Sequence, residues 1–343
     1  MSKYLQLFKR MEDQRGMAAA LVAAMMMLFL GIAALAIDLS YVMVVRNELQ
    51  NAADAAALAG ARVLYPNTPP KSPNWTAAQT EAEAAIGLNK SSGITLSDCQ
   101  AETGYWNLTR TPFGLQGQGI TPGANDAPAV EVTVSRSPGN NGGPLRLFIA
   151  PVIGTNFASV SAQAVAVVQS PGTANAGRLL PMVISKEAAD QAGTYNSAAN
   201  KIRIGSAYHY PNSMAGQWTS FELNTNNVPT VRDLIQNGNP TTLKIGDHIW
   251  IEPGTKNTLY DNSHQPSMSW YVGKDVVFAV VNAVLSDVTH SSVPIYAFIG
   301  FHITDSVGGN GKYVEGYFKG GIFGGLGPSG PNYGLYTPPK LVY

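Results

Sequence analysis

The chain has 343 residues, with 22 lysine and arginine residues against 22 aspartate and glutamate residues, so its net charge at pH 7 is zero. This balance argues against a nucleic-acid-binding protein, which needs a basic excess to meet phosphate, and against an acidic tail. Hydrophobic residues make up 45% and charged residues 13%, so a core can form and wholesale disorder is excluded. Much of the apolar content lies near the N-terminus.

Residues 17–37 form an uncharged run, MAAALVAAMMMLFLGIAALAI, which as a helix would cross a bilayer core of about 30 Å. Basic residues precede the run and Asp38 follows it directly. The positive-inside rule therefore predicts a cytoplasmic stub at residues 1–16, a transmembrane helix at 17–37 and an external remainder. The alternative is a signal peptide cleaved after Ala36, although the run exceeds the usual apolar length of roughly 7–15 residues.

The same helix is expected to continue through residues 39–64, which contain no proline, and to stop before Pro66. Apolar residues recur there at steps of three and four, so they line one narrow seam, whose second half is mostly alanine. Packing against a neighbouring molecule and packing on the protein's own domain both account for such a seam. Its positions are Leu39, Val42, Val45, Leu49, Ala52, Ala56, Ala59 and Val63.

The stretch from Gln14-Arg15-Gly16 through the apolar run to LQNAADAAALAGA at residues 49–61 resembles the N-terminal signature of TadG-like proteins, which belong to the bacterial Tad/Flp pilus-assembly system. The resemblance implies a single-pass protein of the inner membrane with a periplasmic bulk, a scaffold role in pilus assembly and no enzymatic activity. It implies partners among membrane lipid and other pilus-assembly or envelope proteins. The seam described above leaves open a homo-oligomer through the N-terminal helix. The motif residues are Arg15, Gly16, Asp38, Arg46, Gln50, Asn51 and Asp54.

The sequence departs from related proteins at two places. Leu21 stands five residues after Gly16, where a prepilin cleavage site has glutamate, so processing as a pilin is not expected. Neither Asp38 nor Asp261 begins a complete D-x-S-x-S motif, so the sequence predicts no von Willebrand type A domain and no metal site.

Residues 38–170 are expected to form a small α+β region in which the long helix lies on an antiparallel sheet. A Pro-rich linker is predicted at 65–75, helices at 76–89 and 144–153, and strands at 103–110, 129–136 and 160–168. The strand assignment rests on alternation, as in Val130, Val132 and Val134, which are separated by polar residues.

Residues 170–177 are small and uncharged and mark a boundary, after which residues 171–343 are predicted to form a mainly antiparallel β sandwich or barrel. Four stretches carry this prediction, with 276–285 apolar enough to be buried on both faces. They are residues 243–253, 276–285, 293–303 and 312–319.

The sequence shows no catalytic motif and predicts no cofactor. Cys99 is the single cysteine, and no two of the five histidines have the spacing of a zinc site. Two alternative functions stay open. An envelope hydrolase would assemble its site from Asp247, His248, Glu252 and Asp275, and a secreted glycan-binding module would use an exposed row of Trp218, Trp250, Trp270 and Tyr271.

Overall fold

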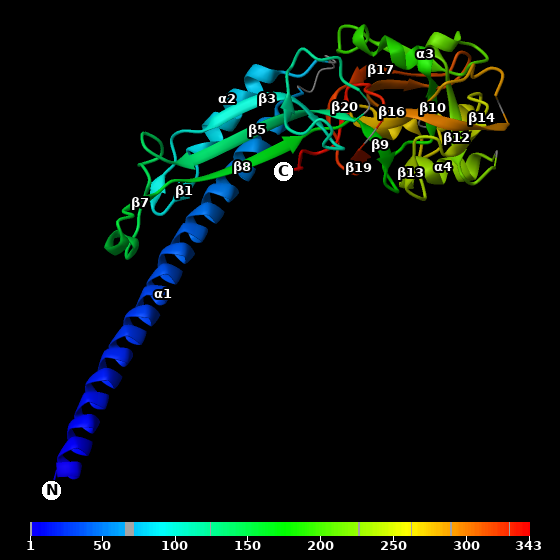
Figure 1. Ribbon diagram of the computed structural model, residues 1–343. Helices are drawn as coiled ribbons and strands as arrows, with labels where there is room; N and C mark the ends of the chain where they lie inside the picture. Colours follow the sequence, from blue (N-terminus) through cyan, green and yellow to red (C-terminus); the bar gives the residue numbers. More distant parts are fainter. Residues whose placement is uncertain are drawn as a thin grey trace. The chain divides into compact units, whose positions relative to one another are not determined.

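The computed structural model describes residues 2–65, 72–123, 125–225, 227–261, 263–288, 290–328 and 330–343. Helix α1 (Ser2–Arg62) is one unbroken helix, the long blue element of Figure 1. Its sequence favours this state because it lacks proline and is rich in alanine, leucine and methionine. The predicted continuation of the apolar run into a long helix is therefore confirmed, whereas residues 66–71 of the predicted linker lie outside the described residues.

Burial of α1 changes at Asp38. Side chains from residue 17 to residue 37 are exposed, apart from the half-buried Ala34, whereas from Asp38 onward one side of the helix is buried. The predicted seam positions Val45, Leu49, Ala52 and Ala56 are all fully buried, so this part of the seam packs on the chain's own fold.

Leu39 is the exception to the predicted seam, because its side chain is exposed. The inward position of that turn is taken by Asp38, which lies seven residues, or two helical turns, before Val45. Asp38 points inward because it makes polar contacts, which a pattern of apolar residues cannot predict.

A five-stranded sheet with the order β21-β8-β5-β3-β4 forms beside α2 (Trp75–Ile86). In β5, Val130, Val132 and Val134 are buried while the residues between them are half-buried, as the alternation predicts. The strands are β3 (Gln100–Asn107), β4 (Leu115–Gln116), β5 (Asp126–Arg136), β8 (Val160–Val167) and β21 (Lys340–Leu341).

The predicted helix at residues 144–153 is wrong. Strands β6 (Leu145–Arg146) and β7 (Phe157–Ala158) form an antiparallel hairpin around the short 3-10 helix η1 (Ala150–Ile153). Pro151 cannot donate a helical hydrogen bond beyond the first turn, and Gly154 ends the turn in the left-handed region with φ of 91°. A second small hairpin joins β1 (Lys90–Ser91) to β2 (Ile94–Thr95).

The C-terminal residues form a seven-stranded sheet with the order β11-β17-β16-β14-β12-β10-β15, and β15 also pairs with β16. This pairing closes β14, β12, β10, β15 and β16 into a ring, so the barrel is the alternative that the structure adopts. Every pair in the ring is antiparallel except β10 with β15, which is parallel. The strands are β10 (Met182–Ser185), β11 (Ile202–Gly205), β12 (Gly216–Phe221), β14 (His248–Glu252), β15 (Asp275–Val281), β16 (Ser291–Val307) and β17 (Tyr313–Lys319).

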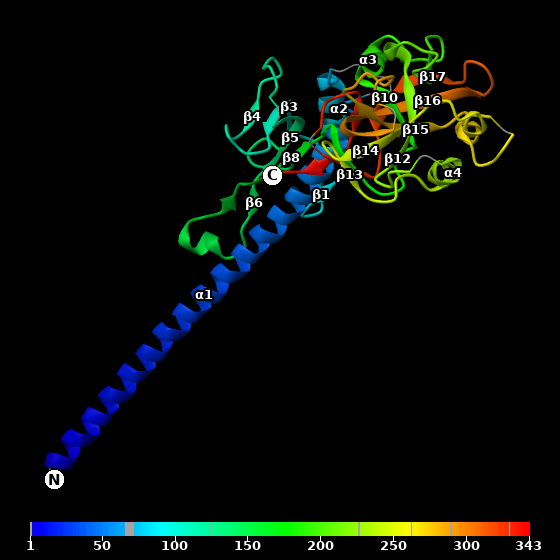
Figure 2. The same ribbon diagram turned by 90° about the vertical axis from the view of Figure 1, so that its right-hand side faces the viewer.

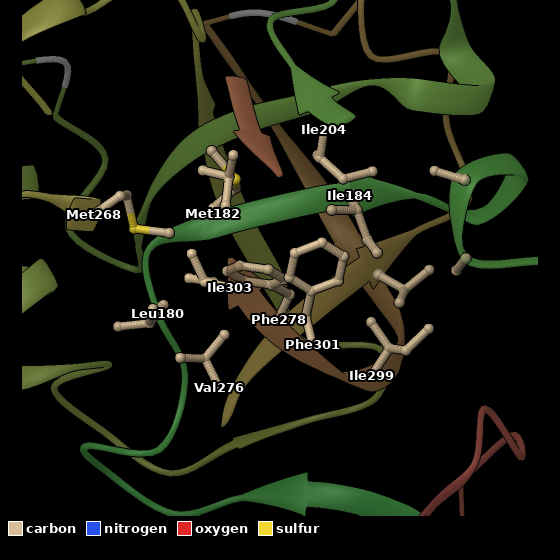
Figure 3. Packing of buried hydrophobic residues seen from close by; sticks show 14 of the residues in the cluster. Leu180, Met182, Ile184, Ile204, Met268, Val276, Phe278, Ile299, Phe301 and Ile303 are labelled. Carbon is tan, nitrogen blue, oxygen red and sulfur yellow. The ribbon is translucent and has the colours of Figure 1, made fainter. Parts of the chain in front are cut away.

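Strand β15 is buried on both faces, as its apolar sequence predicts. Phe278 packs with Met182, Ile184 and Phe301 in one cluster, shown in Figure 3. Val277 and Ala279, on the opposite face, belong to a second cluster with Val183.

Two features of this part differ from the predictions. The stretch 243–253 is broken into β13 (Leu243–Lys244) and β14, because Gly246 turns the chain with φ of 90°. Helix α4 (Val228–Asn237) was not predicted, and its Val231 and Ile235 enter the core. The remaining elements are β9 (Pro171–Ala174), α3 (Lys186–Ala189), η2 (Asp190–Gly193), η3 (Asn212–Met214), η4 (Asn257–Leu259), η5 (Met268–Tyr271), β18 (Gly321–Ile322), β19 (Leu326–Pro328) and β20 (Leu335–Tyr336).

The chain divides into two compact units. The first contains residues 1–55, 83–100 and 132–164, and the second contains residues 56–82, 101–131 and 165–343. The β6–β7 hairpin and α1 up to residue 55 therefore belong to the same unit.

Candidate functional site on the long helix

Asp38 lies directly after the uncharged run, and its side chain is only 3% exposed. Its Oδ1 accepts a hydrogen bond from the backbone N–H of Phe148 at 2.7 Å, and its Oδ2 accepts from Ile149 at 3.0 Å and Ala150 at 2.6 Å. Bonds from N–H to an ionised carboxylate are the stronger kind, and a buried carboxylate requires them. We call this arrangement, Asp38 with the three N–H groups, the Asp38 latch.

Side chains from the next turns of α1 bind a second segment, the turn between β1 and β2. The hydroxyl groups of Tyr41 and Ser92 are hydrogen-bonded at 2.7 Å, and Glu48 Oε2 accepts from the backbone N–H of Ser92 at 2.6 Å. The Tyr41 ring also lies 5.2 Å from that of Phe148, centroid to centroid. The helix thus fixes both the β1–β2 turn and the β6–β7 hairpin through side chains on one face.

Gln50 joins α1 to the sheet. Its Nε2 donates to Asp54 Oδ1 at 2.8 Å and to the backbone carbonyl of Gln163 in β8 at 3.0 Å. Three of the predicted motif residues, Asp38, Gln50 and Asp54, therefore bond within the chain.

The other predicted motif residues face outward or lie beyond the described side chains. Arg46 and Asn51 are exposed on α1. Arg15 and Gly16 lie in the helical segment, but their side chains are outside the described part of the structure. No sequence signal marks Phe148–Ala150 as partners of Asp38, because they contribute backbone N–H groups, which every residue except proline carries.

Comparison with protein families bears directly on this helix. The Tad family, described as Flp pilus-assembly and TadE/G-like, matches residues 16–63, and the Tad_C family, described as Tad-like Flp pilus-assembly, matches residues 59–166. Residues 16–166 are a Tad-like Flp pilus-assembly region. The resemblance to TadG-like proteins is thereby confirmed, whereas no curated protein and no solved structure matches the chain.

The Tad-like region covers six of the seven motif residues, all but Arg15, together with the Asp38 latch and the β6–β7 hairpin. Both families are pilus-assembly families and neither is an enzyme family, which supports a role of the chain in pilus assembly together with other pilus proteins.

Substitution of Asp38 by alanine removes the acceptor for three N–H groups at once. We expect the hairpin to open more often, so that thermolysin cleaves between residues 148 and 157 about tenfold faster than in the unchanged protein. Asp38→Asn keeps one carbonyl acceptor and should give an intermediate rate. The measurement is limited proteolysis of the full chain in detergent, with cleavage sites read by mass spectrometry.

Asn51→Ala is the control for the latch, because Asn51 is exposed on the same helix and should leave the cleavage rate unchanged. Equal rates for Asp38→Ala and Asn51→Ala would show that the latch does not hold the hairpin.

The four residues of the hydrolase alternative do not share a site. In the sheet, His248 is opposite Pro294 and Asp275 is opposite His302, positions separated by roughly 26 Å along β16 at the usual strand spacing. Asp275 Oδ1 lies 2.6 Å from His302 Nδ1, and the buried Glu252 pairs with Lys256. Within the described residues, no three His, Cys, Asp or Glu side chains gather as a metal site would require.

The aromatic row of the glycan-binding alternative is absent from the described surface. Trp218 is fully buried, where it packs at 5.0 Å from the ring of Tyr260, and Trp250 is half-buried. Trp270 is exposed, but Tyr271 beside it is half-buried and donates its hydroxyl to the carbonyl of Ile235 at 2.7 Å. A flat sugar-binding platform built from these rings is therefore ruled out.

A cavity of about 360 Å³ in the second unit was not predicted. The stacked rings of Tyr65 and Tyr336 line it, and burial raises the pKa of Tyr336 to about 12, so its hydroxyl stays protonated at neutral pH. Among the described residues lining it, Asp126 is the single charged one, and its carboxylate accepts from Asn107 and from the backbone of Gly123, each at 2.8 Å. The lining offers no free acid and base pair for catalysis.

Cys99 is expected to react slowly with alkylating reagents. Burial, with the nearby carboxylates of Glu83 and Asp98, raises the pKa of its thiol to about 11. Because the thiolate is the reactive form, iodoacetamide at pH 8 should modify it about a hundredfold more slowly than the same thiol in urea-unfolded protein. The rate should rise with pH up to that pKa. Equal alkylation rates in folded and unfolded protein would contradict a raised pKa of the Cys99 thiol.

Proposed function

We propose that the protein is a single-pass scaffold of Tad/Flp pilus assembly, anchored in the bacterial inner membrane by residues 17–37. The supporting observation is that α1 is apolar along this run, is exposed there apart from the half-buried Ala34, and is long enough to cross a membrane. An apolar surface of this size is not left facing water. The stub at 1–16 would be cytoplasmic, and residues 38–170 and 171–343 would form two periplasmic parts.

Binding, not catalysis, is the proposed mode of action. Arg46 and Asn51 are exposed motif residues in the Tad-like region, so they are free to contact other pilus-assembly proteins or a second copy of the chain. Asp38, Gln50 and Asp54 would act indirectly, by holding the hairpin and β8 against the helix that carries the contact surface.

Anchoring is tested by fractionating cells and determining the N-terminus of the mature protein by mass spectrometry. We expect residues 17–37 to be retained and the protein to stay in the membrane fraction. A soluble product that starts at Ile37 would overturn the anchor and favour a secreted module.

The role in assembly is tested by deleting the gene and counting Flp-type pili by electron microscopy. We expect pili to be lost and to return with the intact gene. Substitution of Arg46 by glutamate should reduce piliation while the protein level stays unchanged, and Lys201→Glu, in the second unit, is the matched charge change. A deletion strain with normal pili would refute the proposal.

A further inference from the structure

The β6–β7 hairpin, residues 145–158, exposes large apolar side chains, with Val152 in its turn and Phe157 in β7 opposite Arg146. Phe148 is 67% exposed, Val152 is 86% exposed and Phe157 is 59% exposed. Arg146 is the single charged residue of the hairpin. Three large apolar side chains on one short hairpin indicate contact with an apolar medium or partner.

The hairpin lies beside the last turns of the uncharged run. A small apolar cavity of about 100 Å³ is lined by Gly31, Ala34 and Leu35 of α1 and by Ile149 and Val152 of the hairpin. Figure 2 shows the turn beyond β6 reaching down next to α1. Both belong to the first unit, so the hairpin tip is at the level of residues that the proposed function assigns to the membrane.

The exposed side chains of α1 also indicate that the hairpin lies beside the membrane-facing part of the helix. Leu39, Met43 and Val44 are exposed, so the apolar surface of the helix continues past Asp38. Arg46 is the first exposed charged side chain after the run. Arg46 lies about three helical turns beyond Leu35, so the hairpin contacts α1 well inside the apolar stretch of its surface.

Most of the backbone N–H groups around the turn of the hairpin are hydrogen-bonded within the chain. Leu147 donates to Asn156, Val152 to Ile149, Gly154 to Pro151 and Thr155 to Ala150. The N–H groups of Phe148, Ile149 and Ala150, just before and at the start of η1, are bound by the Asp38 latch. Unsatisfied backbone groups are costly in lipid, and a buried carboxylate beside the bilayer is tolerated only when it is bound in this way.

We propose that the hairpin inserts Phe148, Val152 and Phe157 into the interfacial region of the bilayer, on the side where α1 leaves it, as a second membrane contact of the protein. Arg146 would lie at the level of the lipid phosphates. The proposal rests on the anchoring proposed above. The lipid bilayer is favoured over a protein partner for two reasons. The turn of the hairpin adjoins the apolar run itself, and the Asp38 latch provides hydrogen bonds to backbone N–H groups that could not bond to water in an apolar medium.

The test uses the full chain in nanodiscs of phosphatidylcholine and phosphatidylglycerol, in a Cys99→Ser background. One fluorophore is attached through Val152→Cys, and matched variants carry it through Leu28→Cys, within the run, or Tyr208→Cys, on an exposed part of the second unit. Nitroxides on the lipid chain near the headgroup or near the bilayer centre, and iodide in water, serve as quenchers.

We expect position 152 to be quenched at least about twofold more by the shallow nitroxide than position 208, and position 28 to be quenched most by the deep one. Lipid quenching at 28 with only iodide quenching at 152 would overturn the hairpin proposal and leave the anchor intact. Absence of lipid quenching at 28 would overturn the anchor itself. Protection of 152 from both quenchers would show that protein covers it, which also overturns insertion into lipid.

Discussion

Replacement of Phe301 by alanine should lower the free energy of unfolding of the C-terminal barrel by about 3–5 kcal/mol, the range for deletion of a buried aromatic ring. Phe301 is fully buried, and its ring lies 5.6 Å from that of Phe278 and 5.4 Å from that of Phe318. It sits on β16, the strand that pairs with β14, β15 and β17 and so closes the barrel. The cavity would form between the rings of Phe278 on β15 and Phe318 on β17.

The measurement is pulse proteolysis of the full chain in detergent across a urea series, scored on fragments from residues 180–319. Phe301→Leu should cost less, because it keeps most of the buried volume. Tyr208→Ala, at an exposed ring, should leave the midpoint unchanged. A midpoint for Phe301→Ala equal to that of Tyr208→Ala would mean that this cluster does not stabilise the barrel.

The N-terminal half could be predicted well because its patterns are strong and local. A long uncharged run followed by apolar residues at steps of three and four leaves few alternatives to one helix, and alternation in 129–136 gives β5 directly. The family signature lies in the same stretch, so the role in pilus assembly was also within reach of the sequence.

The features that could not be predicted depend on contacts distant in sequence. The Asp38 latch joins residues about 110 positions apart through backbone groups, and no side-chain pattern marks those groups. The parallel pairing of β10 with β15 depends likewise on how the barrel closes. The apolar stretch PLRLFIAPVI is compatible with a helix and with a hairpin, and Pro151 inside it is the one local sign against a helix.

Helix α4 is different, because its signals were present in the sequence. Asn227 caps it by accepting from the N–H of Thr230 at 2.8 Å, and Pro229 stands in the first turn, where proline is tolerated. Val231, Leu234 and Ile235 have helical spacing. These local signals predict a helix even within a region that is otherwise rich in strands.

Substitution of Gly60 by alanine should lower the free energy of unfolding by about 1–3 kcal/mol, although alanine favours a helix over glycine. A Cβ atom at Gly60 would lie 2.6 Å from the carbonyl oxygen of Ala78 and 3.0 Å from the Cβ of Ala82, both in α2. The nearest atom belongs to the backbone, so a side-chain rotation cannot relieve the overlap and the two helices must separate. Alanine is frequent on both sides of the contact, in α1 and in α2, and its small side chain permits this close approach.

Gly31→Ala is the matched control, because Gly31 lies in the same helix and a Cβ there would have no neighbouring atom within 4 Å. Thermal unfolding of the full chain in detergent should show a lower Tm for Gly60→Ala and an equal or slightly higher Tm for Gly31→Ala. Gly60→Val should lower the Tm further, since a branched side chain also reaches Val130, whose Cγ1 lies 3.1 Å from the Cβ position. If both alanine variants behaved alike, close packing of α1 on α2 would not be what requires glycine at residue 60.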